Sequence, residues 1–339
     1  MSGLMVFDPQ SEQLKAISHQ ECLVSTPPQT SPEDLSSSRQ QAFEAILLSW
    51  LEHEAVPVRC VPQGEHAEAL SLAVQGVELQ GAGLGDRLVP AVALDSLLKV
   101  YHPEALRYFL LSAGYRKGLG LVAEVRCPTC SSPMSESAQD DLLCDVCDTD
   151  SDDASLQAAL RLPGLDAADA QVAYVYDTLL GAARVLTVSP APEPSAVVMP
   201  AVQAMQASFR SAMNDDLNTE GALKALAEPL KEANRLTQSG KGIDPAVRAR
   251  TLQVFVDALH EVGSVLGLFA IAPLKFIEAR RGPRARQLGL DPQHIDDLVR
   301  ARETARAEKD WARADAARAE LDGLGVRVTD SPEGSIWSL

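Results

Sequence analysis

Four cysteines of the 339-residue chain have the spacing of a metal site. Cys127 and Cys130 form one C-x2-C pair, and Cys144 and Cys147 form a second pair after thirteen intervening residues. Two such pairs supply four thiolates for a tetrahedral zinc ion, and the stretch between them can fold back as a ribbon. We expect the zinc to be structural, because four thiolates leave no open position for catalysis. Two disulfides are the poorer alternative for a cytosolic chain.

A glycine-rich stretch, LQGAGLGD at 79–86, could close on a phosphate with its backbone amides. The stretch lacks the Lys-Ser/Thr ending of a P-loop, and its glycines do not have the G-x-G-x-x-G spacing of a dinucleotide fold. On local evidence alone, a flexible turn is the simpler interpretation.

The composition limits the classes of partner. Thirty Lys and Arg stand against 47 Asp and Glu, for a net charge of −17. This balance argues against general binding of nucleic acids or anionic membranes, although one RNA could bind a local basic face. Candidates for that face are Arg280, Arg281, Arg284, Arg286, Arg300 and Arg302.

Nothing in the sequence indicates a membrane segment. No apolar run approaches 18 residues, and the N-terminal residues lack the charged-then-apolar order of a signal peptide. We therefore expect a cytoplasmic protein without a membrane partner. The two isolated cysteines, Cys22 and Cys60, are expected to be inert.

The elements that must position these residues begin with a mixed segment. ECLV, the helix-like RQQAFEAILLSWLEH and VPVRCV have the order strand, helix, strand of half a nucleotide-binding fold. From Val92 the apolar residues recur at helical spacing. The acidic run at 148–153 bounds the cysteine ribbon, which is therefore expected to be an insertion between helices.

The second half of the chain is predicted to be helical. Four amphipathic segments indicate a bundle: 154–185, 198–212, 219–237 and 245–270. Residues 271–290 have the composition of a basic hinge, for which an exposed linker is the simpler interpretation.

A small unit follows at 291–339. Asp291 and Asp310 can each cap a helix, Gly323 can end the second helix, and DSPEG can turn a hairpin.

Three stretches resemble the cysteinyl-tRNA synthetase family. YHPEALRYFLLSAGYR carries Glu104 to Arg107 at the D-A-L-R position, FRSAMNDDLNTEGALKALAEPLKEANRL resembles the M-x-D-D-x-N-T motif, and ARAEKDWARADAARAELDGLGVRVTDSPEGSIW resembles the C-terminal anticodon-binding domain. The similarity runs from about residue 84 to the end and is interrupted by the ribbon.

The resemblance also shows what the catalytic signatures have lost. VSTPPQTSPEDLSSSR at 24–39 aligns with the stretch that contains H-I-G-H in the family, and its arginine is kept as Arg39. A carboxylate stands where polyphosphate would lie, and Ser25 replaces a cysteine of the substrate-sensing zinc. The four H-I-G-H positions are Asp34, Leu35, Ser36 and Ser37.

LQGAGLGD falls where the family has K-M-S-K-S-L-G-N, so the two lysine positions become Leu79 and Ala82. Lysines there would offset charge developing on the triphosphate. Only about twenty residues separate Val58 from Leu79, too few for the second half of the nucleotide fold. The resemblance thus implies that the chain has no ATP site, no catalytic residues and no cysteine activation of its own.

The anticodon-reading residues of the family have counterparts in Arg306, Trp311, Asp315 and Asp330. Trp311 and Asp315 are four residues apart on one predicted helix and therefore share a face. A ring that stacks on a base beside a carboxylate that accepts from the base edge is suited to single-stranded RNA. Without the resemblance, core packing of Trp311 and a surface ion pair between Arg306 and Asp315 would be the simpler interpretations.

The expected fold class is mainly α, with a shrunken α/β, Rossmann-like remnant at the N-terminus, a helical bundle, an inserted zinc ribbon, and a small C-terminal helical hairpin plus β-hairpin. The expected domains are 1–95 (degenerate catalytic remnant), 96–125 (helices after the signature loop), 126–150 (zinc ribbon), 151–275 (D-A-L-R-type bundle) and 286–339 (anticodon-binding-like domain).

The expected function is a synthetase-like protein without aminoacylation activity that binds a cysteine tRNA or a mimic of its anticodon arm. Two alternatives remain open on the sequence. One is a regulatory or scaffold protein that binds another protein through the ribbon, and the other is a cysteine-tRNA ligase subunit completed by a separate chain.

Overall fold

The structure is a computed structural model, and its chain divides into two compact units. Residues 1–94, 103–124 and 161–270 form the first unit, and residues 95–102, 125–160 and 271–339 form the second. The fold is mainly helical, as predicted. The residues that the structure describes are 5–8, 13–16, 22–26, 34–62, 72, 74–81, 92–127, 129–130, 132, 134–136, 142–144, 146–147, 150–151, 160–331 and 334–339.

The first unit opens with the strand, helix and strand that the sequence predicts. They are β3 (Cys22–Thr26), α1 (Leu35–His53) and β4 (Val58–Pro62). β3 and β4 pair in parallel, as a strand–helix–strand connection requires. An antiparallel pair that the sequence analysis did not anticipate precedes them: β1 (Met5–Asp8) and β2 (Gln13–Ala16).

A second parallel pair joins β5 (Val77–Gly81) to β6 (Leu119–Val125), and β10 (Leu160–Arg161) adds to the other edge of β6. Two expectations are wrong here. Residues 79–81, assigned to a loop, end a strand, and residues 119–125, placed with helices, form one. Every second residue of β6 is buried, and this alternation outweighs the helical pattern before it.

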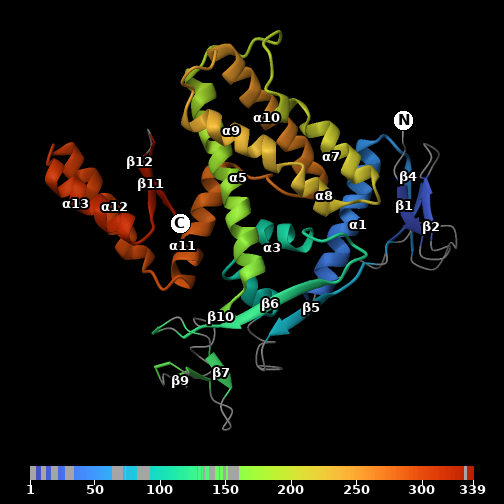
Figure 1. Ribbon diagram of the computed structural model, residues 1–339, viewed down its shortest axis with the longest axis horizontal. Helices are drawn as coiled ribbons and strands as arrows, with labels where there is room; N and C mark the ends of the chain where they lie inside the picture. The colour runs from blue at the N-terminus through green and yellow to red at the C-terminus, as the bar shows by residue number, and fades with distance from the viewer. Residues whose placement is uncertain are drawn as a thin grey trace. The chain divides into compact units, whose positions relative to one another are not determined.

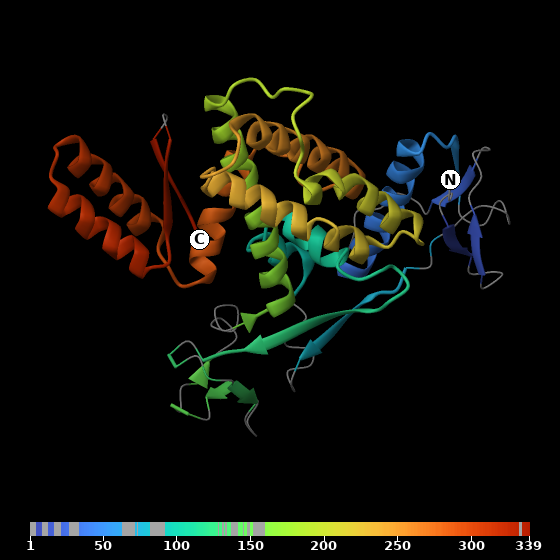
Figure 2. The same cartoon turned by 45° about the horizontal axis from the view of Figure 1, so that its top comes forward.

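The bundle of the first unit surrounds α5. Its helices are α3 (Pro103–Leu110), α5 (Pro163–Val188), α6 (Pro200–Gln203), α7 (Met205–Asn214), α8 (Thr219–Lys224), α9 (Ala227–Gln238) and α10 (Pro245–Leu266). Helix α5 packs against α3, α9 and α10, as both views show (Figure 1, Figure 2). None of the helices in the described part of the chain combines the length and apolar content needed to cross a membrane.

The residues at the D-A-L-R position fasten α3 to the end of α10. The half-buried Arg107 donates from Nε to the carbonyl of Leu266 at 2.5 Å, where the helix leaves carbonyls unpaired. The carboxylate of Glu104 accepts the amide of Phe269 at 2.8 Å. Gly267 has φ +66°, and a Cβ there would lie 2.7 Å from Nε of Arg107. The motif therefore acts as a clamp between helices.

The second unit contains short strands around the cysteines and a separate C-terminal group. The strands are β7 (Met134–Glu136), β8 (Leu142–Cys144) and β9 (Asp150–Ser151), and the short helix α2 (Leu94–Leu98) overlaps the start of this unit. The C-terminal group consists of α11 (Pro273–Gln287), α12 (Pro292–Ala307), α13 (Trp311–Gly323), β11 (Arg327–Ser331) and β12 (Gly334–Ser338).

The caps of α12 and α13 confirm the sequence prediction. The side chain of Asp291 accepts from the amide of Gln293, and that of Asp310 accepts from the amide of Arg313. Gly323 is the last residue of α13, while the left-handed residue after it is Gly325, with φ +73°. β11 and β12 form the predicted antiparallel hairpin.

The expected basic hinge is wrong, because α11 continues through it. Pro283 lies inside the helix and removes one donor, which normally disfavours a helix. Burial of Phe276, Ile277 and Ala285 outweighs that local cost. The expected basic face is also divided, since Arg280 is buried and donates to a main-chain oxygen of Leu339 at 2.6 Å.

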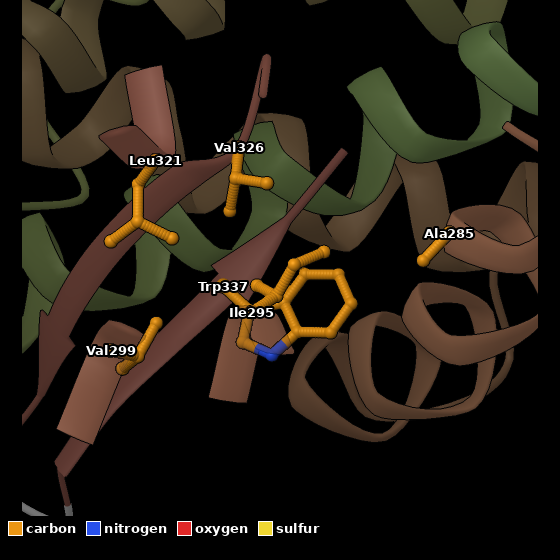
Figure 3. Packing of buried hydrophobic residues seen from close by; sticks show 6 residues of the cluster. All are labelled: Ala285, Ile295, Val299, Leu321, Val326 and Trp337. Atoms are coloured by element: carbon orange, nitrogen blue, oxygen red, sulfur yellow. The ribbon is translucent and has the colours of Figure 1, made fainter. Parts of the chain in front are cut away.

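A compact apolar core unites the C-terminal group (Figure 3). It draws on every helix of the group and on the hairpin, and its buried members are Ala285, Ile295, Val299, Leu321, Val326 and Trp337. The indole of Trp337 donates to Oδ1 of Asp296 at 2.6 Å, and the guanidinium of Arg281 lies 5.3 Å from the ring centroid. Trp337 is therefore the core tryptophan of this domain.

Candidate functional site

The residues at the H-I-G-H position form the beginning of α1. Asp34 is the N-cap, and its carboxylate accepts the amide of Ser37 at 2.7 Å and the hydroxyl of the same residue at 2.8 Å. The Ser37 hydroxyl in turn accepts the amide of Asp34 at 3.1 Å, which completes a capping box. The hydrogen bond from the Ser37 amide lowers the pKa of the Asp34 carboxyl below its usual value. A fixed negative charge therefore occupies this helix N-terminus.

The two positions between Asp34 and Ser37 serve packing. Leu35 is buried, and the Ser36 hydroxyl accepts the amide of Val77 at 3.0 Å, which fastens the start of β5 to the helix. A helix N-terminus attracts phosphate through its free amides and its positive dipole end. Here the carboxylate of Asp34 already accepts the Ser37 amide, so a polyphosphate would meet that carboxylate.

Arg39, the retained arginine of that stretch, is fully buried in α1. Its guanidinium donates only to main-chain carbonyls in the contacts that the structure gives. They belong to Gln75 (2.5 Å), Lys117 (2.8 Å), Ala113 (3.0 Å), Gly114 (3.0 Å), Leu110 (3.2 Å) and Gly76 (3.4 Å). Arg39 therefore fixes the loop after α3 and the entry to β5, a role that the sequence analysis did not predict.

The second signature stretch is described only in part. Leu79 lies in β5 opposite Leu121 of β6 and is 37% exposed, whereas Ala82 lies outside the described residues. An apolar side chain at Leu79 supplies no charge for a phosphate. Ser25 is placed in β3 by its backbone, and the structure does not describe its side chain.

The M-x-D-D-x-N-T motif forms one wall of a pocket of about 410 Å³, and the loop 114–117 forms the other wall. The Tyr115 hydroxyl donates to Asp216 at 2.5 Å, and Arg116 pairs with the same carboxylate at 2.6 Å. Lys117 pairs with Glu220 at 3.1 Å. Carboxylates thus engage both cations of the wall, which is therefore poorly suited to a triphosphate.

The four-cysteine motif converges as its spacing predicts. The four sulfur atoms lie within 4.8 Å of one another. The Sγ atoms of Cys127 and Cys147 are 3.5 Å apart, and those of Cys130 and Cys144 are 3.4 Å apart. Four converging thiols fit a tetrahedral ion with metal–sulfur distances of about 2.3 Å. The cluster follows strand β6 rather than a helix, which corrects the expected insertion point.

The tryptophan and the first carboxylate of the C-terminal set lie on the surface of α13. Trp311 is the first residue of that helix and is 62% exposed, so core packing of this side chain is the wrong interpretation. Asp315 is exposed one turn later. A large exposed indole needs a reason, because burial of an aromatic ring is favourable.

The other two members of the set come from different elements. Arg306 is exposed near the end of α12, so the turn at 308–310 separates it from Trp311. Asp330 lies in β11 and pairs by its backbone with Ser335, while its side chain lies outside the described residues. The structure therefore places three of the four residues around the α12–α13 turn and the fourth on the hairpin.

One side chain near this set was missed by the sequence analysis. Oε1 of Glu303, on α12, accepts the amide of Ser335 at 2.6 Å. Glutamate on a polar helix face gives no signal in the sequence, because its partner lies 32 residues away.

Comparison with known families agrees with this arrangement. Residues 208–270 match the DALR domain, and residues 291–337 match the cysteinyl-tRNA ligase anticodon binding domain. The first range covers the motif turn and α8 to α10, and the second covers α12, α13 and the hairpin.

Curated relatives match nearly three quarters of the chain. The cysteine–tRNA ligase of Trichlorobacter lovleyi is 30% identical over 250 residues, which are 73% of this chain and 43% of the relative. That of Syntrophotalea carbinolica is 32% identical over 247 residues, with 72% and 42% covered. The chloroplastic/mitochondrial enzyme of Arabidopsis thaliana is 28% identical over 249 residues, with 72% and 37% covered.

The chain thus spans about two-fifths of the length of these relatives. The matched domains include the M-x-D-D-x-N-T turn and the capped C-terminal helices. On this evidence the chain belongs to the cysteinyl-tRNA ligase family.

Proposed function

We propose that the chain binds tRNA through its C-terminal anticodon-binding domain and does not activate cysteine. The observation that carries the proposal is that Trp311 is 62% exposed. The core of the same domain is filled by a different tryptophan, Trp337. An indole at the start of a helix can stack on an unpaired base. Asp315, one turn later, can accept hydrogen bonds from the edge of that base.

The charge of the C-terminal group supports an anionic partner better than the whole chain does. Residues 271–339 contain twelve Lys and Arg and twelve Asp and Glu. The net charge of −17 therefore resides entirely in residues 1–270. A neutral domain repels RNA much less than the bulk charge implies, and Arg306 can contact a phosphate or a base.

Titration with unfractionated tRNA at a series of stated salt concentrations tests the proposal. We expect saturable binding that weakens as salt increases, because phosphate contacts release counterions. Absence of binding at low salt would contradict the proposal and favour a protein-binding scaffold instead.

The second half of the proposal predicts no cysteine activation. Asp34 holds the amide that a phosphate would need, and Leu79 replaces a lysine of the signature. Cysteine-dependent ATP–pyrophosphate exchange by the full chain should remain at the buffer background. Exchange that scales with protein concentration and persists through repurification would contradict this prediction.

We also propose that the four-cysteine cluster binds one structural zinc ion. Protein purified without chelator should contain about one equivalent of zinc, as four thiolates in one shell imply. Cys144→Ser removes a buried ligand and should reduce the zinc content, because three thiolates remain. Cys60→Ser, which changes an exposed cysteine of β4, is the matched control and should keep the full equivalent. Folded, reduced wild-type protein without zinc would refute the assignment.

A further inference from the structure

The hairpin β11–β12 is held against α12 at two points. Asp296 accepts the indole N–H of Trp337, and Glu303 accepts the amide of Ser335. The two acceptors are seven residues apart on the helix, which places them on one face. One donor is the side chain of Trp337, and the other is the main-chain amide two residues earlier on β12.

The contact of Glu303 lies at the end of the hairpin that carries Asp330. Ser335 is the register partner of Asp330. The Ser335 amide donates to Glu303 on the helix, and the strand pairing joins the same residue to Asp330. Fixing the Ser335 amide therefore fixes the backbone of Asp330.

The same carboxylate lies one turn before Arg306 on α12. Residues three apart on a helix are neighbours, so Glu303 lies beside this arginine on α12 and also contacts the hairpin. Gly334, next to Ser335, has φ +129°, and a Cβ at that position would lie 3.7 Å from Oε1 of Glu303. The end of the hairpin thus approaches the carboxylate closely.

We propose that Glu303 is a positioning residue for anticodon recognition, which it serves by setting the position of the Asp330 backbone relative to Arg306. The inference rests on the proposed tRNA binding. In this role Glu303 contacts no base itself, and its acceptor oxygen matters more than its charge.

Two substitutions separate these contributions. Glu303→Gln keeps an acceptor for the Ser335 amide and removes the charge, whereas Glu303→Ala removes both. Asp297→Ala is the matched control, because it removes one exposed carboxylate from the same helix without touching the hairpin. The readout is the ratio of affinities for a cysteine tRNA transcript and for transcripts with single anticodon changes.

We expect Glu303→Ala to reduce that ratio at one anticodon position by about fivefold or more, the lower range for one base-edge contact. Glu303→Gln should retain the ratio, and Asp297→Ala should change all affinities alike. Asp330→Ala should have the same effect as Glu303→Ala, and the double variant should be no worse than either, because the two residues act through one contact.

Hydrogen exchange of the hairpin amides gives a second readout that needs no RNA. The Ser335 amide should lose protection in Glu303→Ala and keep it in Glu303→Gln. Wild-type discrimination together with wild-type protection in Glu303→Ala would overturn the inference alone. If the wild-type protein binds tRNA without anticodon preference, or does not bind it, the proposed function is overturned and this inference with it. The exchange result would still show whether Glu303 fixes the hairpin.

Discussion

Replacing Arg39 by Met should destabilise the first unit by about 3 kcal/mol or more, because the change removes a buried guanidinium that donates to six main-chain carbonyls. Its guanidinium is fully buried and satisfies carbonyls of two separate segments, 75–76 and 110–117. Without it, the buried carbonyl of Leu110 and five partly buried carbonyls lose a donor, and a buried group left unsatisfied costs about 1–3 kcal/mol before relaxation. The effect is expected to be among the largest of any single substitution in this unit.

Two further variants make the test specific. Arg39→Lys should not restore stability, because an ammonium group places its three donors on one nitrogen and cannot span these carbonyls. Arg184→Met, on an exposed position of α5, should change the free energy of unfolding by no more than about 0.5 kcal/mol. The measurement is denaturant unfolding followed by circular dichroism. Stability of Arg39→Met within about 1 kcal/mol of the wild type would contradict the assigned role.

Replacing Trp337 by Ala should destabilise the C-terminal group by about 3–5 kcal/mol, the usual cost of removing a large core aromatic. The ring is 1% exposed, its N–H bonds to Asp296, and Arg281 packs over it. Trp311→Ala removes the same type of side chain from the same domain and should change stability by no more than about 0.5 kcal/mol, because the ring is largely in solvent.

The two tryptophans therefore control for each other. Thermal unfolding of both variants measures the difference directly. Equal destabilisation by the two substitutions would contradict the assignment of Trp337 to the core and of Trp311 to the surface.

Local patterns predicted much of this architecture. The C-x2-C spacing placed the four thiols, and Asp291 and Asp310 marked two helix starts through bonds that span two or three residues. The strand, helix and strand around α1 followed from the order of apolar segments. Each of these features depends on residues close together in the sequence.

The features that the sequence did not predict depend on partners that are distant in the chain. The acceptors of Arg39 lie 36 to 78 residues away, and the acceptor of the Ser335 amide lies 32 residues away, so no local signal reveals either contact. The continuation of α11 through Pro283 depends on burial of its apolar residues, which outweighs a local propensity. The residues alone favoured core packing of Trp311, whereas the resemblance required an exposed ring, as the structure has it.

The most direct test of the central claim is the affinity of the wild-type protein and of Trp311→Ala for a cysteine tRNA transcript and for the same transcript with its anticodon exchanged, at one salt concentration. We expect the wild type to prefer the cysteine anticodon, and Trp311→Ala to lose about 1–3 kcal/mol of binding to it while remaining folded. Equal affinity of the wild type for both transcripts, or unchanged binding by a folded Trp311→Ala protein, would contradict the claim that this domain binds the anticodon.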